Sequence, residues 1–212
     1  MIKVKYVSIH AIKDEKMHEH ISALPATMEK EINRYHTIAD RKSRLLGRLM
    51  LKDSVGRAGL PHLIGTVSRN VHNKPCIKGW DAFNISHSGE MVVFAHSRAE
   101  IGIDIEKAGP LDHESLLHNL HPKEQELVRR SADPQQEFYH IWVKKEALLK
   151  AVGTGLMAET ELPDCSGSLL SYKGMDWRFH LLGLAPGYIC YLCAPASQSE
   201  ISIDKFLINT GI

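Results

Sequence analysis

The stretch Ile101-Gly102-Ile103-Asp104-Ile105-Glu106 decides how this chain folds. Apolar and polar residues alternate along it with the period of two that is typical of a β-strand. As a strand, it places its isoleucines on one face and Asp104 and Glu106 on the other. Gly102 shares the acidic face and allows another element to approach it closely, because glycine has no side-chain bulk. Taken alone, the pattern also fits a strand whose two acids point into solvent.

A second carboxylate-bearing segment runs from Trp142 to Gly155. As a helix, it places Trp142, Glu146 and Lys150 one turn apart on a shared face. A Glu–Lys pair at this spacing is usually a surface salt bridge, but the neighbouring tryptophan favours a packed face. Together the two segments would bring three carboxylates and several lysines to one point. This mixture suits a divalent metal ion beside an anionic phosphate.

Composition limits the class of protein. The chain has 212 residues and a formal net charge of +1, which fits one large domain or two small ones. The near-neutral charge does not indicate a nucleic-acid or membrane partner. The alternating stretch from Met1 to Ile9 lacks the continuous apolar core of a signal peptide, and no apolar run approaches the roughly 18 residues of a membrane span. We expect a cytoplasmic protein without a membrane-spanning segment.

The four cysteines do not form a metal-binding motif. Only Cys190 and Cys193 are close in sequence, and the strand-like run that holds them would send their side chains to opposite faces. Buried, reduced thiols are therefore expected at the cysteine positions.

The first half of the chain is predicted to be a strand, helices and then a meander of strands. A helix from about Asp40 to Val55 has an apolar stripe and a basic ridge of arginines and a lysine: Arg41, Arg44, Arg48 and Lys52. The ridge is either a solvated face or an anion-binding surface. Residues 83–89 and 91–96 resemble a β-hairpin, with residues 101–106 as the third strand of the meander.

The second half repeats this make-up. A break at Lys107-Ala108-Gly109-Pro110 is followed by a helix start near His121 and a long helix from Pro134 to Val152, which ends at glycines. Strands are expected at residues 169–172, 177–182 and 187–193. The prediction is an α+β protein of two similar halves, 1–108 and 109–212, with the acidic residues divided between them.

Two further segments carry groups suited to phosphate. Ser86, His87 and Ser88 provide hydrogen-bond donors at a strand end, although a histidine there is most often a structural one. Lys74 precedes Pro75 in a restricted loop, which suits a fixed cation. Neither a Walker A sequence nor a Rossmann glycine fingerprint is present in the sequence, so any phosphate would be held by side chains.

Taken in order, four motifs resemble the 4′-phosphopantetheinyl transferase superfamily, in its larger, Sfp-type branch. They are Asn73-Lys74-Pro75, Phe83 to Gly89, Gly102 to Glu106, and Trp142 to Leu156 with the pattern K-E-A-x-x-K-A-x-G-x-G-L. The resemblance implies a monomer of two α+β halves related by a pseudo-twofold axis, with coenzyme A in the cleft between them. It also implies transfer of the phosphopantetheine arm to a serine of an apo carrier protein, with release of adenosine 3′,5′-bisphosphate.

The resemblance also implies roles for individual residues. The metal ligands for Mg²⁺, or for Mn²⁺ in its place, would be Asp104, Glu106 and Glu146. Coenzyme A would be contacted by residues of three of the motifs and of the basic ridge: Lys74, Pro75, Ser86, His87, Lys145, Lys150, Arg41 and Arg44. Lys150 and His87 would offset leaving-group charge. Glu146 is the expected general base, with Glu124 as the alternative.

The sequence departs from the family at two points. Asn73 stands where the family often has glycine, and asparagine still tolerates a positive-φ turn. Met28-Glu29-Lys30-Glu31 is mixed in charge where family members place basic residues, so Arg34, Arg41 or Arg44 would replace them at the 3′-phosphate of coenzyme A.

Other functions remain open at the level of sequence. The chain could be a non-catalytic relative that binds coenzyme A or a carrier protein, or a Mg²⁺-dependent phosphodiesterase. A nucleic-acid-binding role is the weakest reading, because the charge is near neutral and few aromatic residues lie among the basic ones. The sequence does not indicate whether an acyl, peptidyl or aryl carrier is used.

Overall fold

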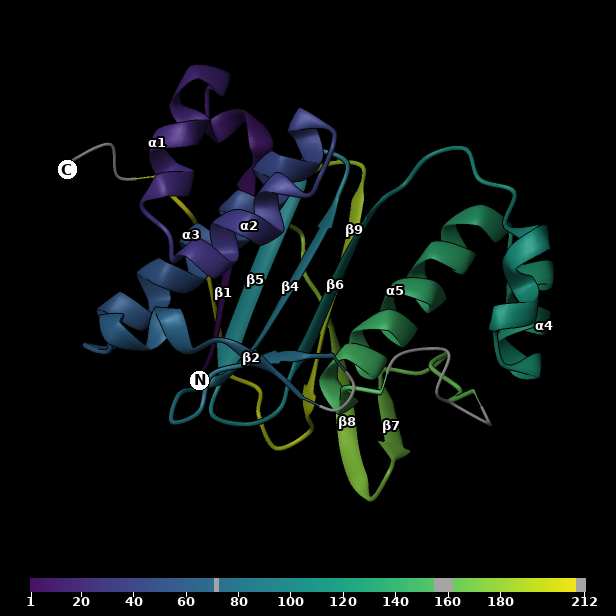
Figure 1. Ribbon diagram of the computed structural model, residues 1–212. Coiled ribbons are helices and arrows are strands. Elements are labelled where there is room, and N and C mark those ends of the chain that lie inside the picture. The colour runs from purple at the N-terminus through teal and green to yellow at the C-terminus, as the bar shows by residue number, and fades with distance from the viewer. Residues whose placement is uncertain (71–72, 155–161, 209–212) are drawn as a thin grey trace.

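The computed structural model describes residues 1–70, 73–154 and 162–208, and these form an α+β protein (Figure 1). The described strands are β1 (Ile2–Ser8), β2 (Ser68–Arg69), β3 (Pro75–Cys76), β4 (Ala82–Ser88), β5 (Met91–Ser97), β6 (Gly102–Lys107), β7 (Leu169–Tyr172), β8 (Met175–Leu181), β9 (Tyr188–Pro195) and β10 (Ile201–Lys205). The described α-helices are α1 (Met17–Ser22), α2 (Ala26–Asn33), α3 (Ile38–Arg57), α4 (Pro122–Arg130) and α5 (Pro134–Val152). Short 3₁₀ helices lie at Ile9–Ala11, Asp14–Lys16, Pro61–Thr66 and Glu114–Asn119.

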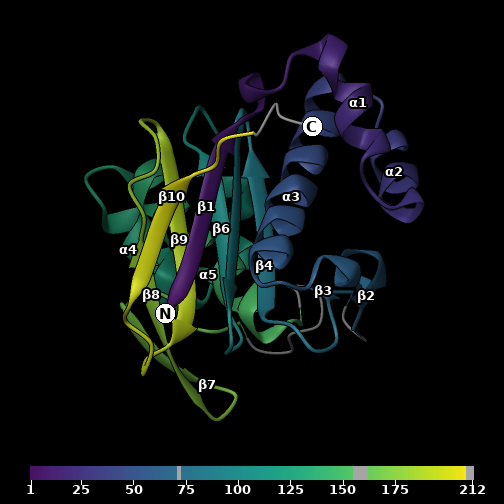
Figure 2. The same cartoon turned by 90° about the vertical axis from the view of Figure 1, so that its left-hand side faces the viewer.

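Two four-stranded sheets form the centre of the molecule. Their strand orders are β10-β1-β5-β4 and β6-β9-β8-β7, and β2 and β3 form a small separate pair. Helix α3, with α1 and α2, lies on the outer face of the first sheet, and α5 lies on the second sheet with α4 beyond it (Figures 1 and 2). The inner faces of the sheets share one apolar core. The predicted α+β class is confirmed.

The two sheets do not follow the division expected at residue 108. Strand β6 belongs to the second sheet, where Gly102 pairs with Cys193. Strand β10 comes from the C-terminal end of the chain and runs parallel to β1, with Ile2 opposite Ile201 (Figure 2). Each half therefore contributes one strand to the sheet of the other.

The prediction that β6 is the third strand of a meander with β4 and β5 is wrong. Strand β5 has β1 on one side and β4 on the other, so both of its edges are occupied. Strand β6 instead pairs with β9 in the second sheet. The alternating pattern identified the strand correctly but contained no information about its partner.

Gly102 explains how α5 reaches β6. A Cβ atom at this position would lie 2.0 Å from the carbonyl oxygen of Ala147 and 2.3 Å from the amide nitrogen of Ala151. The backbone of the helix therefore rests directly on the strand. On the other face, Ile101 and Ile103 are fully buried in the core between the sheets. Asp104 and Glu106 share the face of Gly102, as the alternation predicts.

The ends of the long helices follow from their capping residues. The side chain of Thr37 accepts a hydrogen bond at the start of α3, and the side chain of Asp133 does so at the start of α5. Helix α5 ends at Gly153, which has φ of +81° and accommodates the left-handed conformation that closes many helices. Gly155 and Leu156, the last residues of the sequence motif, lie outside the described residues.

The cysteines occupy the predicted faces of their strand. Cys190 contacts the core between the sheets and Cys193 contacts the core beneath α5. Both are buried, as is Cys165, whereas Cys76 is exposed, contrary to the expectation of buried thiols. Burial raises the pKa of the Cys165 thiol to about 12.

None of the helices in the described ranges is long and apolar enough to cross a lipid bilayer.

Candidate functional site

A polar cluster lies where β4, β6 and α5 meet. The hydroxyl of Ser86 donates a hydrogen bond to Asp104 Oδ1 at 2.7 Å. The ammonium group of Lys150 lies 2.5 Å from the same carboxylate oxygen and 3.1 Å from Ser86 Oγ. Asp104 is buried on β6, and Lys150 extends from the last turn of α5. Residues predicted from three separate motifs are thus within hydrogen-bonding distance of one another.

Two further carboxylates lie in the electrostatic field of Asp104. Burial raises the pKa of Glu106, and the negative charge of Asp104 adds to this, whereas a hydrogen bond from Ser88 and the charge of Lys150 lower it. Burial likewise raises the pKa of Glu146, with further increases from Asp104 and Glu106 and a decrease from Lys150. Three carboxylates and one lysine from both halves of the chain therefore share one electrostatic environment.

The donor set fits a hard divalent cation. Asp104 Oδ2 is buried and has no hydrogen-bond partner among the described residues. Oxygen ligands from carboxylates are those that Mg²⁺ prefers, and a cation would offset the mutual repulsion of the three acids. Within the described part of the chain, however, three or more acidic, histidine or cysteine side chains do not stand together in a ready metal-binding arrangement. The ammonium group of Lys150 neutralises Asp104 instead.

His87 links this cluster to the basic ridge of α3. Burial lowers the pKa of the imidazole, and the positive charges of Arg44 and Lys150 lower it further. The imidazole of His87 is therefore influenced by charges on both α3 and α5. A histidine in this position can donate a hydrogen bond from a neutral ring.

A pocket lined mainly by arginines lies between α2, α3 and β2. Its cationic side chains are Arg34, Arg44, Arg48 and Arg69. Glu31 forms ion pairs with two of them, at 2.9 Å from Arg48 and 3.5 Å from Arg69. The guanidinium group of Arg44 lies 4.7 Å from the ring centroid of Tyr35. The excess of arginine over the single carboxylate makes this pocket suited to an anion.

Arg41 is the second ridge residue, after Arg44, that was expected to contact coenzyme A. It donates a hydrogen bond to Asn33 at 2.8 Å, and its buried Nε has no partner among the described residues. Arg69 was not identified from the sequence, because an isolated arginine on a two-residue strand gives no periodic signal.

Lys74 is held by three acceptors outside the carboxylate cluster. Its ammonium group lies 2.6 Å from the carboxylate of Glu100, 3.0 Å from the carbonyl of Ala151 and 3.2 Å from the carbonyl of Ile101. It thus connects the loop before Pro75 to the end of α5. The predicted positive-φ turn is confirmed, since Asn73 has φ of +66°.

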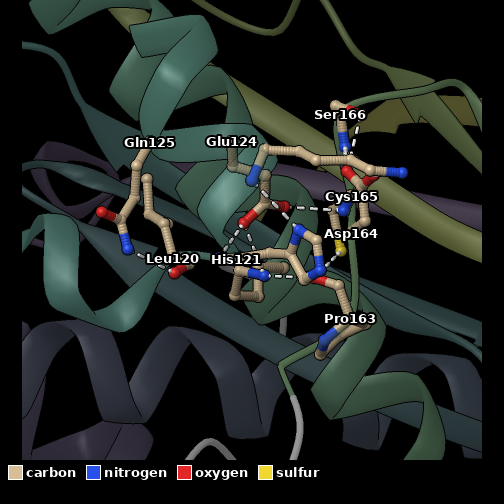
Figure 3. Close-up of polar contacts among 10 residues, drawn as sticks. Leu120, His121, Glu124, Gln125, Pro163, Asp164, Cys165 and Ser166 are labelled. Carbon is tan, nitrogen blue, oxygen red and sulfur yellow. Dashed lines mark hydrogen bonds and ion pairs between the residues drawn. The ribbon is translucent and has the colours of Figure 1, made fainter. Parts of the chain in front are cut away.

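Lys145 on α5 and Glu124 on α4 form a buried ion pair, and neither side chain reaches the carboxylate cluster. Both side chains are fully buried, and their charged atoms lie 2.8 Å apart. Glu124 also accepts hydrogen bonds from the amides of His121 at 2.7 Å and Cys165 at 2.6 Å (Figure 3). Lys145 donates to the carbonyl of Pro163. The structure therefore does not bring Lys145 and Glu124, two of the expected site residues, into the carboxylate cluster.

The geometry of helix α5 explains why Lys145 points away from the cluster. Lys145 precedes Glu146 by one position, which turns its side chain by about a hundred degrees around the helix, away from the face of Glu146 and Lys150.

Known protein families match the chain over most of its length. Residues 100–187 match the family model described as the 4′-phosphopantetheinyl transferase superfamily, and residues 12–99 match the model described as 4′-phosphopantetheinyl transferase, N-terminal. The chain is 32% identical over 150 residues to 4′-phosphopantetheinyl transferase Sfp of Bacillus subtilis (strain 168), covering 68% of this chain and 67% of that protein. The chain belongs to the 4′-phosphopantetheinyl transferase superfamily. It is accordingly an enzyme of this family.

Other phosphopantetheinyl transferases show similar agreement. The enzyme gsp of Aneurinibacillus migulanus is 28% identical over 160 residues, which is 74% of this chain and 68% of that protein. The human L-aminoadipate-semialdehyde dehydrogenase-phosphopantetheinyl transferase is 30% identical over 153 residues, or 63% of this chain and 50% of that protein. The two family models meet at residues 99 and 100, directly before β6, so phosphopantetheinyl transferase sequences also divide close to this strand.

Proposed function

We propose that this protein transfers the 4′-phosphopantetheine group of coenzyme A to a serine of an apo carrier protein, in a reaction that depends on Mg²⁺. The serine oxygen would form a bond to the phosphorus that carries the pantetheine arm. The bond from that phosphorus to the bridging oxygen would break, and adenosine 3′,5′-bisphosphate would leave with the electron pair. The serine proton would pass to a carboxylate base.

One observation supports this proposal above the others. Asp104 and Lys150, which come from different halves of the chain, lie 2.5 Å apart with Ser86 on the same carboxylate oxygen. A carboxylate and an ammonium group side by side suit a metal-bound pyrophosphate, because one group serves the cation and the other the anion.

Asp104, Glu106 and Glu146 are the proposed ligands of Mg²⁺. The bound ion would neutralise charge on the pyrophosphate as the phosphorus–oxygen bond breaks. The raised pKa values of Glu106 and Glu146 support this assignment, because they arise from burial beside other negative charges. Mn²⁺ has the same preference for carboxylate oxygens and would replace Mg²⁺.

The phosphates of coenzyme A are proposed to extend from the cluster toward the arginine-lined pocket. Lys150, Ser86 and His87 would contact the pyrophosphate, and His87 would donate from a neutral ring. Arg44 and Arg34 would hold the 3′-phosphate, since Glu31 already engages Arg48 and Arg69 in the pocket. Arg41 belongs to the same basic ridge of α3 and would be a secondary contact. Lys74 and Pro75 would bound the site from the loop side.

Glu146 is the proposed base in preference to Glu124. Both oxygens of Glu124 accept hydrogen bonds from backbone amides, and its charge is paired with Lys145 in a fully buried site. A base must be accessible to the proton that it removes. Glu146 is only partly buried and lies within the field of the other two acids.

The proposed partner is a carrier protein or carrier domain of fatty-acid, polyketide or nonribosomal peptide synthesis. We further propose that the enzyme is a monomer, because its two halves supply both sides of the site within one chain. We also propose that it acts in the cytoplasm.

Incubation with coenzyme A and Mg²⁺ and a panel of apo carriers would test the proposal. We expect the mass of at least one carrier to increase by that of phosphopantetheine, with adenosine 3′,5′-bisphosphate in the supernatant. Omission of Mg²⁺, or addition of a chelator, should stop the reaction. Hydrolysis of coenzyme A without any carrier would instead indicate a phosphodiesterase, and binding without mass gain would indicate a non-catalytic relative.

Two substitutions test the roles of the acids. Asp104→Ala and Glu146→Gln should each lower kcat/KM by at least about a hundredfold, because they remove charge that the transition state requires. Circular dichroism should show that both variants remain folded. Normal turnover in either variant would rule out that residue as a ligand or base.

A further inference from the structure

Strands β4 and β6 lie side by side although they belong to different sheets (Figure 1). In the described part of the chain, a backbone ladder does not connect them. Alternate side chains of β4 make the connection instead. Ser86 bonds to Asp104, Asn84 accepts a hydrogen bond from the amide of Ile103 at 3.1 Å, and Ser88 bonds to Glu106.

The hydroxyl group of Ser88 makes two hydrogen bonds to β6, one as a donor and one as an acceptor. The hydroxyl donates to Glu106 Oε2 at 2.6 Å and accepts from the backbone amide of Lys107 at 3.1 Å. A hydroxyl group has one proton to donate. Because the oxygen of Ser88 accepts a hydrogen bond from the amide of Lys107, its proton is left to point at the carboxylate of Glu106. The side chain of Glu106 is thus tied to the backbone of its own strand through Ser88.

The position of Ser88 separates its role from that of Ser86. Ser86 shares the oxygen of Asp104 with Lys150 and so belongs to the cluster itself. Ser88 is one strand period further along and touches Glu106 alone among the three acids. Its hydrogen bond engages Oε2 and restrains the rotation of the Glu106 carboxylate.

The electrostatics of the cluster explain why such a restraint is needed. Asp104 and Glu106 lie on the same face of β6 and repel each other when both are ionised. Without a fixed partner, the longer side chain of Glu106 would rotate away from Asp104 and disperse the ligand set. Groups that hydrogen-bond to metal-binding carboxylates typically contribute 10- to 100-fold to metal affinity.

From this geometry we propose that Ser88 is a positioning residue, which holds the Glu106 carboxylate beside Asp104 so that the two bind a divalent cation together. The proposal rests on the proposed function, because it concerns the same Mg²⁺-dependent transfer. It assigns Ser88 no contact with coenzyme A.

Three variants test the proposal. Ser88→Ala removes the hydroxyl group, and Ser88→Thr retains it. Ser97→Ala is the matched control, because Ser97 is a buried strand serine whose hydroxyl donates to Gln198 at 2.9 Å, outside the site. For each protein, the affinity for Mg²⁺ is measured by calorimetry in the presence of coenzyme A, alongside the KM for coenzyme A, kcat and the urea midpoint.

We expect Ser88→Ala to weaken Mg²⁺ binding about tenfold or more, while the KM for coenzyme A at saturating Mg²⁺ changes less than about twofold. Ser88→Thr and Ser97→Ala should bind Mg²⁺ like the wild type. A Ser88→Ala variant with wild-type Mg²⁺ affinity would overturn the positioning role and leave the transfer function intact. Equal losses in Ser88→Ala and Ser97→Ala would also overturn it, because the effect would then be general destabilisation.

A different outcome marks failure of the function itself. If the wild-type protein neither binds Mg²⁺ with coenzyme A nor modifies any carrier, the proposed function falls, and the role of Ser88 falls with it.

Discussion

At the scale of single residues, Gly102 has the most consequences for the site. Its missing side chain lets the backbone of α5 rest on β6, and that contact brings Lys150 to Asp104. The close approach is unusual for a strand position, where glycine normally weakens packing. The geometry of the cluster therefore depends on a residue that takes no part in the chemistry.

Gly102→Ala should destabilise the protein by at least about 2 kcal/mol, because the added Cβ would overlap backbone atoms that cannot rotate away. Urea unfolding measures this change. Gly56→Ala is the matched control: it lies in α3 with open space around it, and should stabilise by about 0.4 to 1 kcal/mol. A Gly102→Ala variant as stable as the wild type would show that α5 does not pack against β6 in this way.

Much of the cluster could be predicted from single residues and their spacing. The alternation at residues 101–106 gave the correct face for Asp104, and helical spacing gave the correct face for Glu146 and Lys150. Lys145 was expected at coenzyme A because the resemblance to the family motif implied it, whereas in the structure it pairs with Glu124, which is distant in sequence. Long-range ion pairs of this kind leave no local pattern.

At the scale of elements, the pair of Glu124 and Lys145 joins α4, α5 and the segment at residues 163–165. Glu124 completes the cap of α4 by accepting from the amide of His121, and it binds the amide of Cys165 with its other oxygen. The pair thus fixes the outer side of α5, the helix whose inner side carries Glu146 and Lys150.

Lys145→Met should destabilise the protein by about 3–5 kcal/mol, because it leaves the Glu124 carboxylate buried without a counter-charge. Thermal or urea denaturation measures the loss. Replacing both residues, as Glu124→Gln with Lys145→Met, should cost less than the sum of the two single changes. The exposed pair of Arg130 and Glu126 on α4 is the control, and Glu126→Gln should change stability by less than about 1 kcal/mol. Additive losses in the double variant would show that the two charges are not coupled.

At the scale of the whole molecule, buried and half-buried histidines give stability a dependence on pH. His96 on β5 is hydrogen-bonded to Asp81 and stacked on Trp80. Burial nevertheless lowers the pKa of its imidazole in the folded protein, and the charges of Lys3 and Lys5 add to this, although Asp81 opposes it. Burial also lowers the pKa of His87, His140 and His180.

Stability should therefore fall as the pH decreases below about 6.5, the usual histidine pKa. In that range these histidines bind more protons in the unfolded chain than in the folded protein, so their protonation favours unfolding until the folded pKa is reached, whereas the raised pKa values of Glu106 and Glu146 oppose this at lower pH. The urea midpoint measured from pH 7.5 to 5 follows this change. His96→Gln should reduce the pH dependence, and an unchanged slope in that variant would exclude His96 as a source of it.

The strand exchange between the two sheets could not be predicted from sequence. Hydrophobic alternation located β1, β6 and the strands of the second half. The sequence of a strand, however, does not indicate which other strand it pairs with. Strand β10 was not anticipated at all, although its five residues complete the first sheet (Figure 2). Pairing between β1 and β10 is decided by the tertiary structure.

That parallel pairing has a consequence for synthesis on the ribosome. Strand β1 is translated well before its partner at residues 201–205, which follows almost two hundred residues later in the sequence. Once β4 and β5 have also been made, a sheet of β1, β5 and β4 would keep one edge of unpaired backbone groups until β10 is available, and such an edge can pair with other chains. Completion of the first sheet therefore depends on the last strand of the described chain.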